Sequence, residues 1–196
     1  MSIVLNISPD LNTKIYIWEI NENENDLINQ NSDTSFLKTV NNTLVRKQKL
    51  AVRAILKNLG INSDIEYSNT GKPHLKTHNI GISHSNKYVS IILSKNNNVA
   101  IDIETKIDKA WKLRNKFFHI NEFDNIKDSV QSALAWSAKE TYVKLHDSKH
   151  IEFSSIFTRI ISNDTIEIID SFNTIERYHY KLTKNFILVW ANKAYS

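Results

Sequence analysis

Residues 99–104, Val-Ala-Ile-Asp-Ile-Glu, constrain the fold more than any other segment, because apolar residues alternate there with two acids. Side chains along a β-strand point alternately to its two faces, so Asp102 and Glu104 are predicted to share one face of a short strand. Two carboxylates at this spacing repel each other, and a hard divalent cation such as Mg2+ relieves the repulsion. The alternative is an exposed strand edge that carries two solvated acids.

Residues 129–146 have the strongest helical pattern in the chain, and they add charges to this pair. Trp136, Glu140 and Lys144 fall at positions i, i+4 and i+8, on one face of the predicted helix. Ordinary Glu–Lys pairing on a solvated surface is one explanation, whereas the tryptophan in line with the pair indicates a partly buried face. With Lys139, the helix is predicted to bring a third carboxylate and two ammonium groups to the two acids of the strand.

Two scarce residue types limit the chemistry of the chain. None of the 196 residues is cysteine, which excludes disulfides, thiolate zinc sites and cysteine nucleophiles and leaves oxygen ligands for a metal. Only three residues are glycine, so the Gly-rich phosphate loops of the Walker and dinucleotide-binding types are absent. A bound phosphate would therefore be held by side chains.

The charge balance favours an anionic partner. The formal net charge is +4, and residues 34–63 contain no acid at all. A helix is predicted over residues 43–59, where Arg46, Lys49 and Arg53 share one face at i, i+3 and i+7. A solvated helix surface would also carry lysines, but the missing glutamates argue for an anion against this face.

The sequence contains no sign of a membrane segment or a leader. No apolar run approaches the roughly 20 residues that a membrane-spanning helix needs. Residues 1–10 lack the basic start and the apolar stretch of a signal peptide. The expected location is the cytoplasm.

A predicted turn and a predicted strand contribute further polar side chains. Pro73 biases Lys72 toward an extended conformation in the turn of residues 69–73. Residues 80–85 are predicted as a strand that ends with Ser83, His84 and a further serine, before a second strand over residues 88–93. A lone histidine at a strand end is more often structural, and no nucleophile-elbow sequence surrounds either serine.

The predicted elements repeat one plan, helices followed by antiparallel strands, once in residues 1–98 and once in residues 99–196. The fold class expected is therefore α+β with two halves. The other predicted elements are a strand at 14–20 and another at 64–68, a helix at 107–118, a short element from 121, and a meander of strands at 155–161, 165–170, 175–182 and 186–191.

Taken in order, these motifs resemble the 4'-phosphopantetheinyl transferase superfamily, in its long, monomeric, surfactin-type branch. Each motif is weak by itself, but their order and spacing are specific. Ala100 stands where the family usually has glycine, and a methyl group costs little in a strand. The motifs are Asn69-x-Gly71-Lys72-Pro73, Ile82-Ser83-His84-Ser85, Ile101-Asp102-Ile103-Glu104, Phe117-Phe118 with Glu122, and Trp136-x-x-Lys139-Glu140-x-x-x-Lys144.

The resemblance implies a fold and an activity. The fold has two similar α/β halves packed pseudo-symmetrically, with coenzyme A in the cleft between them, in a single chain that needs no oligomer. The activity is the transfer of the 4'-phosphopantetheine arm of coenzyme A to a serine of an acyl or peptidyl carrier protein, which releases adenosine 3',5'-bisphosphate. The reaction uses Mg2+, with Mn2+ as an alternative.

The resemblance also implies roles for individual residues. The metal ligands would be Asp102, Glu104 and Glu140. The residues at the coenzyme A phosphates would be Arg46, Arg53, Lys72, Ser83, His84 and Lys144. Lys144 would neutralise a pyrophosphate oxygen, and Glu122 would act as the general base on the serine hydroxyl, directly or through water.

Two other functions are consistent with parts of the sequence. A nucleic-acid-binding module would explain the basic segment 34–63, but it requires stacking aromatics among the cations, and Phe36 is the only one there. A different Mg2+-dependent phosphohydrolase would use Asp102 and Glu104, but it leaves Lys72, Ser83 and His84 without a shared role.

Overall fold

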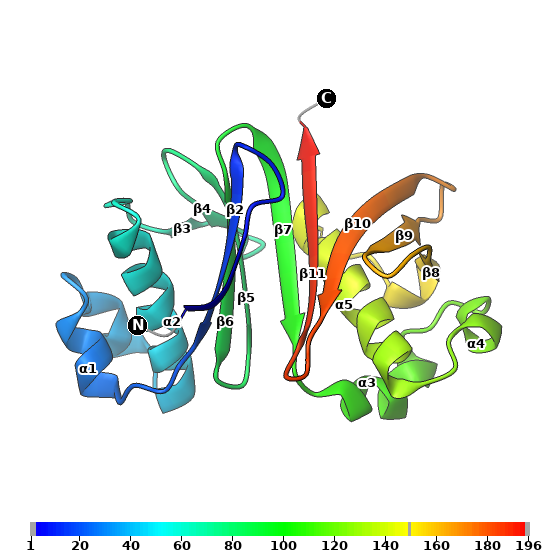
Figure 1. Ribbon diagram of the computed structural model, residues 1–196, viewed down its shortest axis with the longest axis horizontal. Helices are drawn as coiled ribbons and strands as arrows, with labels where there is room; N and C mark the ends of the chain where they lie inside the picture. Colours follow the sequence, from blue (N-terminus) through cyan, green and yellow to red (C-terminus); the bar gives the residue numbers. More distant parts are fainter. Residues whose placement is uncertain (1–2, 149, 195–196) are drawn as a thin grey trace.

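The computed structural model describes residues 3–148 and 150–194. It is a mixed α+β structure built on antiparallel sheets. The strands occupy the middle of the molecule, with α1 and α2 on one flank and α3, α4 and α5 on the other (Figure 1). No helix in the described part of the chain is long and apolar enough to cross a membrane.

The first part of the chain forms a four-stranded sheet in the order β1-β2-β6-β5. Its strands are β1 (Ile3–Ile7), β2 (Thr13–Glu19), β5 (Asn79–Ser85) and β6 (Tyr88–Ser94). The helical elements beside it are α1 (Glu24–Asn29), a 3-10 turn (Ser35–Thr39) and α2 (Thr43–Asn58). One face of α2, including Leu50 and Ile55, packs in a core with Trp18, Val89 and Ile91 of the sheet.

The ends of α2 follow the local sequence. The Asn42 side chain accepts a hydrogen bond from the Val45 N–H and so caps the first turn. Gly60 follows the last turn at φ +74, a left-handed conformation that favours glycine. The helix predicted over 43–59 is thus confirmed. The strand predicted at 64–68 is shorter, because β3 (Glu66–Tyr67) pairs only with β4 (Pro73–His74).

The second part of the chain forms a five-stranded sheet in the order β7-β11-β10-β9-β8. Its strands are β7 (Asn97–Glu104), β8 (Phe157–Ile160), β9 (Thr165–Ile169), β10 (Ile175–Leu182) and β11 (Ile187–Ala194). The helical elements are α3 (Ile107–Leu113), α4 (Glu122–Asn125), α5 (Ser129–His146) and two 3-10 turns, Arg114–Lys116 and Phe153–Ser155. Ala133, Leu134 and Ala138 of α5 share a core with Ile166 and Ile168 of the sheet.

The predicted elements need three corrections. The helix predicted to reach residue 118 ends at Leu113, and Phe117 and Phe118 lie beyond it as buried core residues. The strand β7 begins at Asn97, so the predicted division after residue 98 falls inside a strand. The strand β1 was not predicted at all.

The two sheets meet where β5 lies against β7. A Cβ added at Gly81 of β5 would come 2.8 Å from Ile92 Cγ2 and 3.2 Å from Ala100 Cα, so glycine permits this close approach. Serine hydroxyls bridge the two strands. Ser83 Oγ accepts from the Ile103 N–H at 3.3 Å, and Ser85 Oγ accepts from the Thr105 N–H at 3.1 Å.

The alternation predicted for β7 is confirmed. Ile101 and Ile103 join a core between the two sheets, together with Ile15 and Ile92. Asp102 lies on the opposite face of the strand, is only 6% exposed, and accepts a hydrogen bond from Ser137 of α5. The alternative of an exposed strand edge with solvated acids is therefore wrong for Asp102.

Candidate functional site

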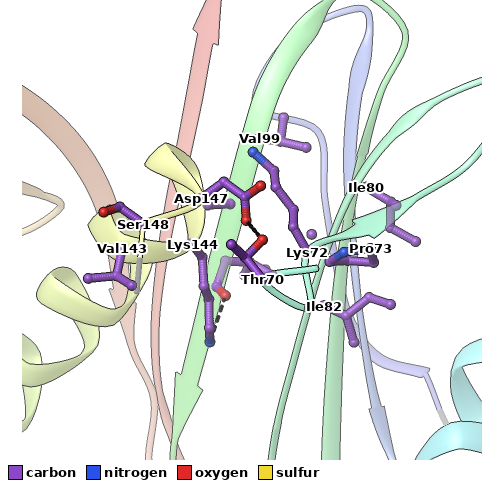
Figure 2. Close-up of a pocket in the computed structure, with 14 residues that line it drawn as sticks. Thr70, Lys72, Pro73, Ile80, Ile82, Val99, Val143, Lys144, Asp147 and Ser148 are labelled. Carbon is purple, nitrogen blue, oxygen red and sulfur yellow. Dashed lines mark hydrogen bonds between the residues drawn. The ribbon is translucent and has the colours of Figure 1, made fainter. Parts of the chain in front are cut away.

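A cavity of about 240 Å3 lies where the two halves of the chain meet. It is lined by the turn before β4, by β5 and β7, and by the end of α5 (Figure 2). Thr70 in the turn donates a hydrogen bond to the Asp147 carboxylate just after α5, which ties the turn across the cavity. Figure 2 shows Lys72 and Lys144 at this cavity with their ammonium ends pointing in opposite directions.

Asp102 is the point where three elements converge. Its Oδ1 accepts a hydrogen bond from Ser83 Oγ of β5 at 2.9 Å and lies 2.6 Å from Lys144 Nζ of α5. Its Oδ2 accepts from Ser137 Oγ of α5 at 2.7 Å. The structure therefore brings Asp102, Ser83 and Lys144 together, although they lie far apart in the sequence.

Glu104 lies two residues further along β7 and is held differently. Its Oε1 accepts from Ser85 Oγ at 3.0 Å and from the backbone N–H groups of Thr105 and Lys106 at 2.7 and 2.6 Å. No described residue donates to Oε2. One oxygen of this carboxylate is thus fixed and the other is free to accept a ligand.

Glu140 of α5 faces the same group of charges. Burial raises the pKa of Glu140, the Lys144 ammonium opposes this, and the nearby Asp102 and Glu104 carboxylates raise it further. None of the described residues forms a hydrogen bond or an ion pair with the Glu140 carboxylate. Asp102 and Glu104 therefore act on Glu140 electrostatically, and Lys144 offsets this only from a distance, without an ion pair.

These acids do not form a closed metal cage as they lie. No group of three or more His, Asp or Glu side chains in residues 3–148 and 150–194 is arranged to hold a metal ion. The Lys144 ammonium instead forms an ion pair with Asp102 and supplies the positive charge there. The donor chemistry nevertheless fits a hard divalent cation, because all the donors are carboxylate oxygens and no described cation forms an ion pair with Glu140.

A second cavity, of about 210 Å3, adjoins the first through the shared residues Gly71, Pro73 and Ile82. It is lined by His84 and by Lys49 and Arg53 of α2. Desolvation of the imidazole lowers the pKa of His84, the neighbouring ammonium groups of Lys144 and Lys49 lower it further, and Asp102 opposes them. The His84 ring is therefore neutral near pH 7, in a strongly cationic surrounding.

The predicted basic stripe of α2 is divided. Arg53 stacks on Phe36, with the guanidinium carbon 3.6 Å from the ring centroid, and lines the second cavity. Arg46 does not line either cavity. Its guanidinium lies 2.6 Å from Glu24 Oε1 and donates to backbone carbonyls of the preceding segment, so it holds α1 and α2 together. The predicted coenzyme A contact at Arg46 is not supported by this position.

Lys72 lies at the cavity, but its ammonium is directed away from the acids. Its Nζ donates to the Leu145 carbonyl at 3.0 Å and to Asn98 Oδ1 at 3.2 Å. Burial lowers the pKa of Lys72, and Asp147 partly opposes this. Lys72 thus lines one end of the cavity, beside the last turn of α5.

The position of Glu122 does not support the predicted role as general base. Its side chain is fully buried, and Lys139 Nζ lies 2.6 Å from its Oε2. The same oxygen accepts from the His119 N–H at 2.7 Å, and Oε1 accepts from both the N–H and the hydroxyl of Thr158. A carboxylate enclosed and bonded in this way is not placed to reach a bound hydroxyl, so we treat Glu122 as structural.

Lys139 also lies away from its expected position. It was expected beside the acids of β7, but it is fully buried on another face of α5. Besides its ion pair, its ammonium donates to the carbonyls of Phe117 and Phe153 at 2.8 and 2.9 Å. Of the two predicted ammonium groups, α5 therefore delivers only Lys144 to the site.

The site also contains residues that the sequence motifs passed over. Ser137 occupies a position of the Trp136-x-x-Lys139 motif at which the motif specifies no residue type. Ser85 has no predicted role, and Lys49 is predicted only as part of the basic stripe. Their hydrogen bonds and positions at the cavities identify them as part of the site. The sequence offers one signal, for Ser85: the two-residue spacing of Ser83 and Ser85 matches that of Asp102 and Glu104, with which they form hydrogen bonds.

No protein-family model matches this sequence, and no curated protein shows significant similarity to it.

Proposed function

We propose that this chain transfers the 4'-phosphopantetheine arm of coenzyme A to a serine of an acyl or peptidyl carrier protein and releases adenosine 3',5'-bisphosphate. The observation that carries the proposal is the convergence on Asp102. Ser83 from β5, Lys144 from α5 and the acid itself from β7 lie within hydrogen-bond distance of one another beside a cavity. The motifs of the family supply these same residues.

The charges around the cavity suit a ligand with several phosphates. Attack on a diphosphate phosphorus depends on positioning and on charge neutralisation more than on covalent help from the protein. The Lys144 side chain is 34% exposed, so its ammonium can contact a ligand oxygen although it is paired with Asp102. Lys49, Arg53 and His84 in the adjoining cavity supply further contacts for phosphate groups.

The three acids would hold the divalent cation. Asp102, Glu104 and Glu140 provide carboxylate oxygens, and Mg2+ or Mn2+ bound to them would neutralise the charge on the diphosphate. A cation there would also stabilise the ionised form of Glu140, whose pKa is raised by burial and, to a smaller extent, by Asp102 and Glu104.

We assign the role of general base to no other side chain among the described residues. Positioning of the serine hydroxyl and neutralisation of the diphosphate charge supply most of the catalysis that a protein gives to such a transfer. We therefore propose that this chain binds and orients coenzyme A, and that solvent accepts the proton of the carrier's serine hydroxyl.

The remaining parts of the proposal follow from the same family. The two halves would correspond to the pseudo-symmetric halves of the phosphopantetheinyl transferase fold, and the chain would act as a monomer in the cytoplasm.

Mass spectrometry of apo carrier proteins tests the proposal. After incubation with the protein, coenzyme A and Mg2+, the carrier serine should carry one phosphopantetheine arm, and chelation of the metal should prevent the modification. Hydrolysis of coenzyme A at the pyrophosphate without transfer to any carrier would indicate a phosphohydrolase instead. Salt-dependent binding to DNA, together with no binding of coenzyme A, would indicate a nucleic-acid-binding module.

A further inference from the structure

Ser137 makes an unusual contact for a serine in the interior of a helix. Such hydroxyls commonly bond to the helix's own backbone carbonyl four residues earlier. The Ser137 hydroxyl instead donates across to Asp102 Oδ2 of β7 at 2.7 Å, and the Ser137 side chain is fully buried. This contact links α5 to the strand that carries the acids.

Each oxygen of Asp102 accepts a hydrogen bond from a serine hydroxyl, and Oδ1 also contacts a lysine. Oδ1 is shared by the short Ser83 hydroxyl and the long, partly exposed Lys144 side chain. Oδ2 is held by Ser137, whose side chain has only one torsion to its hydroxyl oxygen. Rotation of an aspartate carboxylate is a soft, roughly two-fold motion, so donors on both oxygens are needed to fix it.

Lys144 cannot be relied on to fix Asp102 during binding, because its ammonium would move to the ligand phosphates in the proposed function. Ser83 would then remain on Oδ1 and Ser137 on Oδ2, one from each half of the chain. We propose that Ser137 is a positioning residue that holds the Asp102 carboxylate in the orientation required for a divalent cation. This inference rests on the proposed function in that it assumes a cation at the acids.

Ser132 provides a matched control on the same helix. It is also fully buried, but its hydroxyl has no hydrogen-bond partner among the described residues. Replacing either serine with alanine removes one buried hydroxyl from α5. Only the change at position 137 removes a donor to an acid.

Binding of Mn2+ to the full chain, followed by electron paramagnetic resonance in the presence of coenzyme A, tests the proposal. Partners that orient metal ligands typically contribute about 10- to 100-fold in metal affinity. We therefore expect Ser137→Ala to raise the Kd for Mn2+ by about 10- to 100-fold, and Ser132→Ala to leave it within about twofold. Ser137→Cys, which keeps the volume and a weak donor, should lie between wild type and Ser137→Ala.

The outcomes separate this inference from the proposed function. If Ser137→Ala and Ser137→Cys bind Mn2+ as tightly as wild type, the positioning role is wrong, while transfer to a carrier can still stand. If wild type itself binds no Mn2+ with coenzyme A present, both the positioning role and the metal part of the proposed function are wrong. Circular dichroism of each variant shows whether the fold is retained, and if Ser137→Ala does not fold, Ser137→Cys decides.

Discussion

Two lysines of α5, five positions apart, form ion pairs in very different surroundings. Lys139 and Glu122 are both fully buried, whereas the Lys144 side chain is 34% exposed beside Asp102. A buried pair is costly to break, because removal of one partner leaves the other charge without compensation. A pair that reaches solvent can exchange its partner for a ligand. These surroundings predict opposite results for two substitutions.

Glu122→Gln should destabilise the fold more than it changes chemistry. The Lys139 ammonium would lose its counter-charge, which costs about 3 to 5 kcal/mol for a buried pair. Urea unfolding should show this loss, and the double substitution Glu122→Gln with Lys139→Met should recover much of it. Folded Glu122→Gln protein should bind coenzyme A normally. Undiminished stability together with a large loss of turnover would restore the role of general base.

Lys144→Met should have opposite effects on two ligands. Without the ammonium on Asp102, Mn2+ should bind the free protein about tenfold more tightly, which corresponds to an electrostatic gain of about 1.4 kcal/mol. Coenzyme A should bind more weakly, because a cation for its phosphates is lost. Titration calorimetry measures both affinities. Lys106→Met serves as the control for the loss of one charge near β7, and equal effects of the two substitutions would contradict a specific exchange at Asp102.

At the scale of elements, the sequence predicts what is periodic and long. The helix over 129–146 and the strand over 175–182 were predicted to the residue, because each has a sustained pattern. The helix from 107 was predicted too long, since Phe117 and Phe118 fit a helical core face but are buried after a 3-10 turn. The short strand β1 is a brief apolar run, which periodicity alone does not distinguish from a buried helix segment, and its pairing with β2 makes it a strand.

The candidate site was predictable where a charged residue lies on a regular element. Asp102 and Lys144 fall at the expected faces of β7 and α5. Arg46 and Glu122 are of residue types common in functional sites. Each instead forms an ion pair with a residue distant in the sequence and so lies outside the site. Ser137 is uncharged and the motif specifies no residue type at its position, so only its hydrogen bond to Asp102 identifies it as part of the site.

The contact between β5 and β7 should respond to one added methyl group. In Gly81→Ala, the new Cβ would lie 2.8 Å from Ile92 Cγ2 and 3.2 Å from backbone, so the strands must shift. Overpacking of this kind costs about 1 to 3 kcal/mol, and the shift should also weaken coenzyme A binding. Gly60→Ala costs about 1 kcal/mol through its left-handed backbone, but lies at the end of α2 and should leave coenzyme A affinity unchanged. Equal coenzyme A affinity in both variants would contradict the role of Gly81.

At the scale of the whole molecule, stability in acid should depend on Glu176 of β10. Burial alone would raise the pKa of Glu176, but hydrogen bonds from His146, Lys193 and Tyr178 lower it to about 2. These three partners come from α5, β11 and β10, so the carboxylate holds one end of the second half together. The ordinary pKa of the group is 4.5, which applies to the unfolded chain.

The sign of the effect follows from these two values. Because the folded protein keeps Glu176 ionised to lower pH than the unfolded chain does, its contribution is complete above about pH 4.5 and is lost as the pH falls toward 2. Thermal unfolding should therefore show wild type above Glu176→Gln in Tm at pH 6, with the gap closing between pH 4.5 and 2. Glu66→Gln, at an exposed position of β3, is the control and should change Tm little at pH 6. A gap between wild type and Glu176→Gln that stays constant down to pH 2 would mean that the ionised carboxylate does not hold these three elements together.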